Sequence, residues 1–83
     1  MEPKVFVYSR GKRKLIDISL LKIGDIVKVS RNGEAFWVKV SRIEPNYHFY
    51  GIVNNPAVNP KNGRLGSLIK FKLIKRKGYE WLG

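Results

Sequence analysis

The chain has 83 residues, of which 43% are apolar and 12% aromatic, and it contains no cysteine. This length is typical of a single domain with one hydrophobic core, and the lack of cysteine excludes disulfides and thiolate metal sites. Lysine and arginine number 17 against 6 acidic residues, which gives a formal net charge of +11. A field of this sign attracts polyanions at long range; the alternative is that the charge only keeps the surface soluble.

The N-terminal residues and the apolar runs predict where the protein resides. Residues 1–8 include Glu2 and Pro3 and lack the pattern of a signal or transit peptide. No apolar run approaches the roughly 20 residues that span a bilayer, and a chain without cysteine suits a reducing compartment. We therefore expect an intracellular protein, cytoplasmic or nuclear, that is not secreted and has no membrane partner.

The periodicity predicts strands along almost the whole chain. Apolar residues alternate with polar ones or form short β-branched runs, and helical spacing never lasts more than a turn. Residues 17–24, DISLLKIG, predict one helical turn that is capped by Asp17 or Ser19 and ended by Gly24. The expected strands cover residues 5–8, 14–16, 25–30, 34–43, 48–53 and 68–74, and a short seventh strand covers residues 79–82.

Two glycine-containing turns and one long loop separate these strands. Residues 31–34, RNGE, predict a two-residue type I′ hairpin, which needs positive φ at both central positions. Residues 9–12, SRGK, predict a similar but looser turn with basic side chains at its tip. Residues 54–66, NNPAVNPKNGRLG, form a loop that contains Lys61 and Arg64, for which a binding role and a plain surface connection are equal alternatives.

The element pattern predicts an all-β fold in one domain, residues 1–83. We expect a small, strongly bent antiparallel barrel or roll of five to six strands at residues 17–75, with an added N-terminal hairpin at residues 1–16. Residues 76–83 are expected to form a basic and aromatic tail, which either docks its rings on the barrel or becomes ordered on a polyanion. The expected core residues are Val5, Val7, Ile16, Leu21, Ile26, Val27, Val29, Phe36, Val38, Val40, Ile43, Ile52, Ile69, Phe71 and Leu73.

Two expected strands carry aromatic residues beside cations. In residues 34–43, Phe36 points to one face, and Trp37 and Lys39 point to the other. An exposed Trp37 beside Lys39 is typical of modules that stack on bases; the alternative is that Trp37 closes one end of the barrel or packs under the long loop. Tyr50 lies beside Trp37 if the two strands pair. A cage for methylated lysine is a further alternative, less suited to a positively charged protein.

Few residues support catalysis or metal binding. The single histidine, His48, lies within an aromatic strand, and the six acidic residues fall mostly at turns or strand ends, where capping and solvation explain them. The glycines fit turn or strand positions, and none forms a phosphate-binding loop. We therefore expect no enzyme activity, no cofactor and no metal site.

Four segments, IGDIVKV, NGEAFWVKVSRI, YGIVNN and LGSLIKFKLI, resemble a recurrent small SH3-like barrel pattern over about residues 20–75. The chain is similar to the uncharacterised DUF2314-like domains and, more loosely, to the KOW and Tudor barrels. It departs from the former at Gly66-Ser67, where those domains usually have Gly-Asp, and in being much more basic. The resemblance implies an SH3-like fold and no particular activity.

We expect a non-catalytic nucleic-acid-binding module that contacts mainly the phosphate backbone, with aromatic stacking and little sequence selectivity. The alternatives of DNA or RNA, single strand or duplex, and monomer or weak dimer are left open. A second function class is a protein-interaction module whose basic face or exposed strand edge binds an acidic or extended partner. The expected nucleic-acid-binding residues are Arg10, Lys12, Arg13, Lys14, Trp37, Lys39, Arg42, Tyr50, Lys61, Arg64, Lys70 and Lys72.

Overall fold

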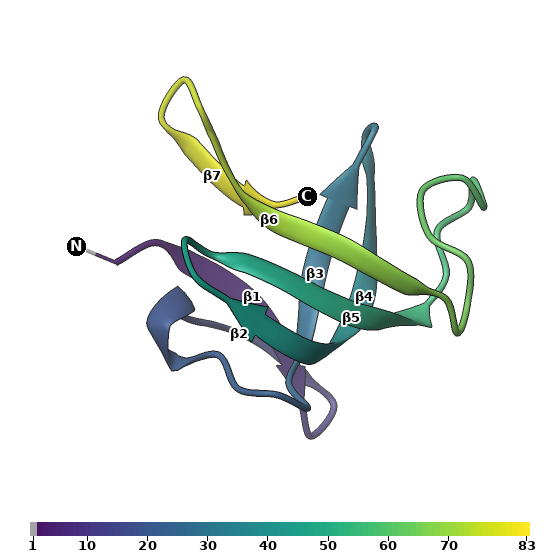
Figure 1. Cartoon of the computed structure of the whole chain (residues 1–83), viewed down its shortest axis with the longest axis horizontal. Helices are drawn as coiled ribbons and strands as arrows, with labels where there is room; N and C mark the ends of the chain where they lie inside the picture. Colours follow the sequence, from purple (N-terminus) through teal and green to yellow (C-terminus); the bar gives the residue numbers. More distant parts are fainter. Residues whose placement is uncertain (1) are drawn as a thin grey trace.

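The computed structural model describes residues 2–83, which form seven strands and one short 3₁₀ helix (Figure 1). All paired strands are antiparallel, and each strand expected from the sequence is present, so the all-β prediction is confirmed. The elements are β1 (Lys4–Ser9), β2 (Lys12–Asp17), η1 (Ile18–Leu20), β3 (Ile26–Arg31), β4 (Glu34–Glu44), β5 (His48–Asn55), β6 (Leu68–Arg76) and β7 (Tyr79–Leu82).

The strands form one sheet in the order β2-β1-β3-β4-β5-β6-β7. The sheet is strongly bent, so that β6 crosses β3 in Figure 1 and β7 contacts both β3 and β1. The guanidinium of Arg31, at the end of β3, donates a hydrogen bond to the backbone carbonyl of Lys70 on β6. The sheet is not closed into a barrel. Of the two expected forms it is therefore the roll, with the expected N-terminal hairpin of β1 and β2 at one edge.

Three two-residue turns connect neighbouring strands. Both central residues of each turn have positive φ, between 49° and 80°, which is the backbone conformation of a type I′ turn. The expected hairpin at residues 31–34 is confirmed, and the turn at residues 9–12 is as tight as the first. The third turn joins β6 to β7, so residues 76–83 belong to a hairpin. The central pairs are Arg10-Gly11, Asn32-Gly33 and Lys77-Gly78.

The hydrophobic core fills the inside of the roll. Phe49 on β5 stacks on Phe71 on β6, with ring centroids 5.5 Å apart and planes 21° from parallel. Gly51 lies so close to β4 that a Cβ there would be 2.5 Å from Val38 Cγ1 and 2.6 Å from the Lys39 carbonyl oxygen. The buried apolar residues are Val5, Val7, Ile18, Leu21, Val27, Val29, Phe36, Val38, Val40, Phe49, Val53, Phe71 and Leu82.

Most of the expected core is confirmed, but two positions on β4 and β5 were predicted wrongly. Ile43 is 43% exposed, because it lies next to the end of β4. Ile52 is 37% exposed, because the alternate set of β5 residues, Phe49 and Val53, faces inward. The partly buried members of the expected core are Ile16, Ile26, Ile69 and Leu73.

The connection between β2 and β3 contains the expected short helical turn. It is the 3₁₀ helix η1, with Asp17 at its N-cap position, although the Asp17 side chain makes no capping hydrogen bond. Gly24 has φ of 99°, four residues after the helix, and does not end it directly. The Asp25 carboxylate instead accepts a hydrogen bond from the Lys22 amide at 2.9 Å.

The long loop after β5 is an ordered connection tied to the start of β4. The Glu34 carboxylate accepts hydrogen bonds from the backbone amides of Val58 (2.6 Å) and Asn59 (3.0 Å) and from the Asn62 side chain (2.7 Å). These donors, Asn59 foremost, lower the pKa of Glu34 despite its partial desolvation. Asn62 is buried, and Gly63 packs directly on the ring of Phe36. The base of the loop therefore has a structural role.

Candidate functional site

The side of the sheet that faces away from the core carries both aromatic and basic side chains. Side chains alternate along each strand, so the register that turns Val27 and Val38 inward turns Lys28 and Trp37 outward. We call this surface the outer face. It includes Phe6, Tyr8, Arg13, Lys28, Trp37, Lys39, Arg42, Tyr50, Lys70 and Lys72.

One aromatic cluster lies where β1, β3 and β4 meet. The rings of Tyr8 and Trp37 are 5.5 Å apart between centroids, with an interplanar angle of 59°. Nearby, the charged ends of Arg13 and Lys28 lie 5.2 and 5.4 Å from the centroid of Phe6. Tyr8 is 45% and Phe6 is 38% exposed, so parts of both rings are free to contact a ligand. Cations this close to an aromatic face are held by cation–π attraction.

A second cluster surrounds Tyr50 on β5. Arg42 on β4 and Lys70 on β6 place their charged ends 5.5 and 5.6 Å from the centroid of the Tyr50 ring. Arg42 also forms an ion pair with Glu44 at 3.0 Å. Between the two clusters Lys39 pairs with Ile26 on one side and Ile52 on the other. On the outer face, aromatic rings and cations thus lie next to one another in both clusters.

The structure shows where Trp37 lies, which the sequence left open. It is half-buried on the outer face beside Tyr8, opposite Asn55 in the strand register. A small depression of about 320 Å³ lies between Trp37, Tyr8, Asn54 and Asn55. Of the alternatives for Trp37, the structure thus has it on the outer face, next to Asn54 and Asn55 at the start of the long loop, and not at an end of the roll.

Seven of the twelve expected binding residues lie on the outer face, and five lie elsewhere. Arg10 is at the tip of the β1–β2 turn. Lys12 and Lys14 are on the opposite side of β2 from Arg13, because Lys14 pairs with the inward-facing Val7. The remaining two, on the exposed surface of the long loop, are Lys61 and Arg64.

Three residues of the outer face, Phe6, Tyr8 and Lys28, were missed by the sequence-based prediction. Their signal was present, because alternation along β1 sends Phe6 and Tyr8 to the face opposite Val5 and Val7. The missing information was that β1 pairs with β3. That long-range pairing brings Tyr8 within reach of Trp37.

The carboxylates of the chain are all engaged within residues 2–83. Glu2 accepts a hydrogen bond from the Tyr47 hydroxyl, which raises the pKa of Tyr47, while Asp25 and Glu34 accept hydrogen bonds from backbone amides. All 17 basic side chains lie within residues 2–83, and among these described residues three of them form ion pairs and 14 do not. The three pairs are Lys4–Asp17 (2.7 Å), Arg42–Glu44 (3.0 Å) and Lys75–Glu80 (3.4 Å).

Residues 2–83 give little support for a metal site or a membrane-spanning helix. No group of three or more His, Asp or Glu side chains within residues 2–83 is placed to hold a metal ion. His48 Nδ1 lies 3.3 Å from the Pro45 carbonyl oxygen. Among the same residues no helix is long and apolar enough to cross a membrane.

Comparisons with known proteins give no relative from which a function could be transferred. No protein-family model, no curated protein and no solved structure matches this chain. The function must therefore be inferred from the surface chemistry of the roll itself.

Proposed function

We propose that the protein is a non-catalytic nucleic-acid-binding module that uses the outer face as its binding surface. The observation that carries this proposal is the alternation of rings and cations there: Tyr50 lies between Arg42 and Lys70, and Phe6 lies between Arg13 and Lys28. Cations neutralise phosphates, and exposed rings offer a surface on which bases stack.

The charge balance of the molecule supports a polyanionic ligand. The 14 basic side chains without an ion pair repel one another, which destabilises the compact state unless counterions or a ligand offset the repulsion. Glu44, beside the Tyr50 cluster in the strand register, is paired with Arg42, and Glu80, which lines a cavity with Phe6 and Lys28, is paired with Lys75. A phosphate backbone meets no free carboxylate at Tyr50 and Phe6.

Little sequence selectivity is expected from this chemistry. Phosphate contacts carry no sequence information directly, and stacking on a ring is tolerant because every base has a π-face. Selective readout needs donors and acceptors aligned with base edges. The outer face offers mainly rings, aliphatic side chains and cations.

A binding assay with a matched pair of variants tests the proposal. Fluorescence anisotropy of labelled single-stranded DNA, duplex DNA and RNA would be measured at two salt concentrations, with tryptophan fluorescence followed in parallel. Trp37→Ala removes one stacking ring, which should weaken binding by about 1–3 kcal/mol, or roughly 5- to 150-fold. Leu20→Ala, at a 61% exposed apolar residue of the short helix η1, should leave affinity unchanged.

Three results would contradict the proposal. The first is that none of the three nucleic acids binds near physiological salt. The second is that binding depends only weakly on salt concentration. The third is that Trp37→Ala and Leu20→Ala bind equally well while both variants retain the circular dichroism of the parent. The first of these would redirect the search to acidic protein partners.

A further inference from the structure

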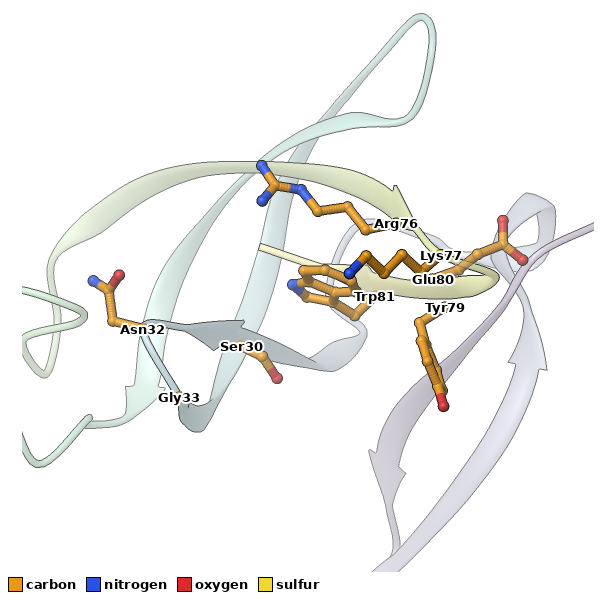
Figure 2. A pocket seen from close by; sticks show the side chains of 8 residues that line it. All are labelled: Ser30, Asn32, Gly33, Arg76, Lys77, Tyr79, Glu80 and Trp81. Atoms are coloured by element: carbon orange, nitrogen blue, oxygen red, sulfur yellow. The ribbon is translucent and has the colours of Figure 1, made fainter.

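A groove separates the β6–β7 hairpin from the end of β3, on a part of the molecule that the outer-face clusters do not include. Figure 2 shows the indole of Trp81 in this groove, with Arg76 and Lys77 from the hairpin on one side and Ser30 from β3 on the other. Its volume of about 620 Å³ lies within the range of small-ligand pockets. The groove is open to solvent, and Tyr79 at its rim is 75% exposed.

The groove exists because β1 and β3 diverge. They pair only at Val7–Val27 and Tyr8–Ile26, so the rest of β3 separates from β1, and β7 contacts both strands there. This arrangement holds Trp81 half-buried and Leu82 fully buried. The indole is thus fixed in place by the adjacent core residue rather than carried on a free tail.

The groove is continuous with the outer face. A second, smaller cavity of about 150 Å³ is lined by Phe6, Lys28 and Ser30 on one side and by Trp81 and Glu80 on the other. Phe6 and Lys28 belong to the first aromatic cluster, and Ser30, Glu80 and Trp81 also line the groove. A chain that follows the outer face past Phe6 therefore reaches Trp81 without crossing the core.

The charges of the groove match those of the outer face. Arg76 and Lys77 form no ion pair, whereas the single carboxylate of the groove, that of Glu80, lies 3.4 Å from the amino group of Lys75. An aromatic ring next to two cations is complementary to a planar base with an adjacent phosphate. This complementarity selects a nucleotide over a neutral apolar ligand.

We propose that the groove is a second subsite for the nucleic-acid strand bound on the outer face, and that it takes an unpaired base against Trp81 while Arg76 and Lys77 contact the flanking phosphate. The proposal rests on the proposed function and adds the ligand class: the strand is single-stranded where it enters the groove. A base within a duplex stacks on its neighbours and has no free face for the indole.

The two tryptophans of the chain allow each subsite to be observed separately. Trp37→Phe leaves Trp81 as the fluorophore, and Trp81→Phe leaves Trp37. Each variant would be titrated with an oligothymidylate of about 12 nucleotides, within the ~4–16 nucleotides that a single-strand-binding OB fold covers, and with a blunt duplex that includes the same sequence. We expect the single strand to quench Trp81 in Trp37→Phe, and the duplex to leave Trp81 unchanged.

A charge variant tests the phosphate contact independently of fluorescence. Arg76→Gln removes one of the two cations beside Trp81 and should weaken binding of the single strand about fivefold at ~0.1 M salt. Lys22→Gln is the control, because it also removes one exposed positive charge but lies in the connection between β2 and β3. We expect the control to bind like the parent protein.

The outcomes separate this inference from the proposed function. If Trp37 is quenched in Trp81→Phe but Trp81 is not quenched in Trp37→Phe, the groove is not a subsite and the outer face stands. If the duplex quenches Trp81 as strongly as the single strand, the requirement for an unpaired base is wrong. If anisotropy detects no binding at all, the proposed function and the inference fail together.

Discussion

Two lysines of the outer face offer the cleanest test of how the protein holds a phosphate backbone. Lys39 on β4 and Lys72 on β6 both point outward, opposite Ile52 and His48 respectively. Neither side chain takes part in an ion pair or a cation–π contact. Lys39→Gln/Lys72→Gln therefore removes two ligand-facing charges without breaking a contact that holds the fold together.

The magnitude follows from counterion release. Each phosphate neutralised on a single strand contributes a slope of about −0.7 to the logarithm of affinity against the logarithm of salt concentration. Since this term vanishes on extrapolation to ~1 M salt, one contact is worth about fivefold in affinity at ~0.1 M. Loss of two contacts should weaken binding about 25-fold at ~0.1 M and make the slope shallower by about 1.4.

The assay is fluorescence anisotropy of a labelled single strand over a series of salt concentrations. The control variant, Lys12→Gln/Lys14→Gln, has the same net charge, but its two positions lie on the other side of β2 from Arg13. We expect the control to change the slope by much less. An equal loss in both variants would show that total charge, rather than the outer face, determines binding, and it would refute the assignment of this surface.

Two further predictions concern the fold that holds these surfaces. Gly51→Ala places a Cβ 2.5 Å from Val38 Cγ1 and 2.6 Å from the Lys39 carbonyl oxygen, and should destabilise the protein by about 1–3 kcal/mol in thermal or denaturant unfolding; an unchanged unfolding midpoint would contradict the close packing. Hydrogen bonds to the Glu34 carboxylate, first of all the one from the Asn59 amide, lower the pKa of Glu34 from its ordinary 4.5. The ionised carboxylate therefore stabilises the fold above pH 4.5, and this stabilisation is lost as the pH falls through the lowered pKa. Glu34→Gln should therefore be less stable than the parent at neutral pH, with the difference shrinking on acidification; a difference independent of pH would refute this role.

The strands and turns were predictable because they depend on local sequence. Asn32-Gly33 requires positive φ at both positions and so fixes one hairpin. The inward face of β5 was not predictable in the same way. Period-two alternation leaves two equivalent choices, and the correct one depends on contacts with other strands, such as the stacking of Phe49 on Phe71. The register shift in β4 between Val40 and Arg42 also interrupts simple alternation.

The candidate site was predictable only where a residue pattern and a strand face coincide. Trp37 and Lys39 are two residues apart on one strand, so alternation alone places them together. The ring contact between Tyr8 and Trp37 joins residues 29 positions apart in the sequence and depends on both β1 and β4 pairing with β3. Trp81 enters its groove only because β7 contacts β3 across the roll.

The positive charge of residues 10–14 has a structural explanation that does not apply to the charges of the outer face. β2 is an edge of the sheet, and charged side chains on an edge strand, lysine above all, block unwanted pairing with other chains. The other edge, β7, has only four residues, and short edges are protected in the same way. Both edges thus disfavour a partner that adds a strand. Lys39, by contrast, lies on β4 and is paired with Ile26 of β3 on one side and with Ile52 of β5 on the other, so edge protection does not account for its charge, whereas the proposed nucleic-acid ligand does.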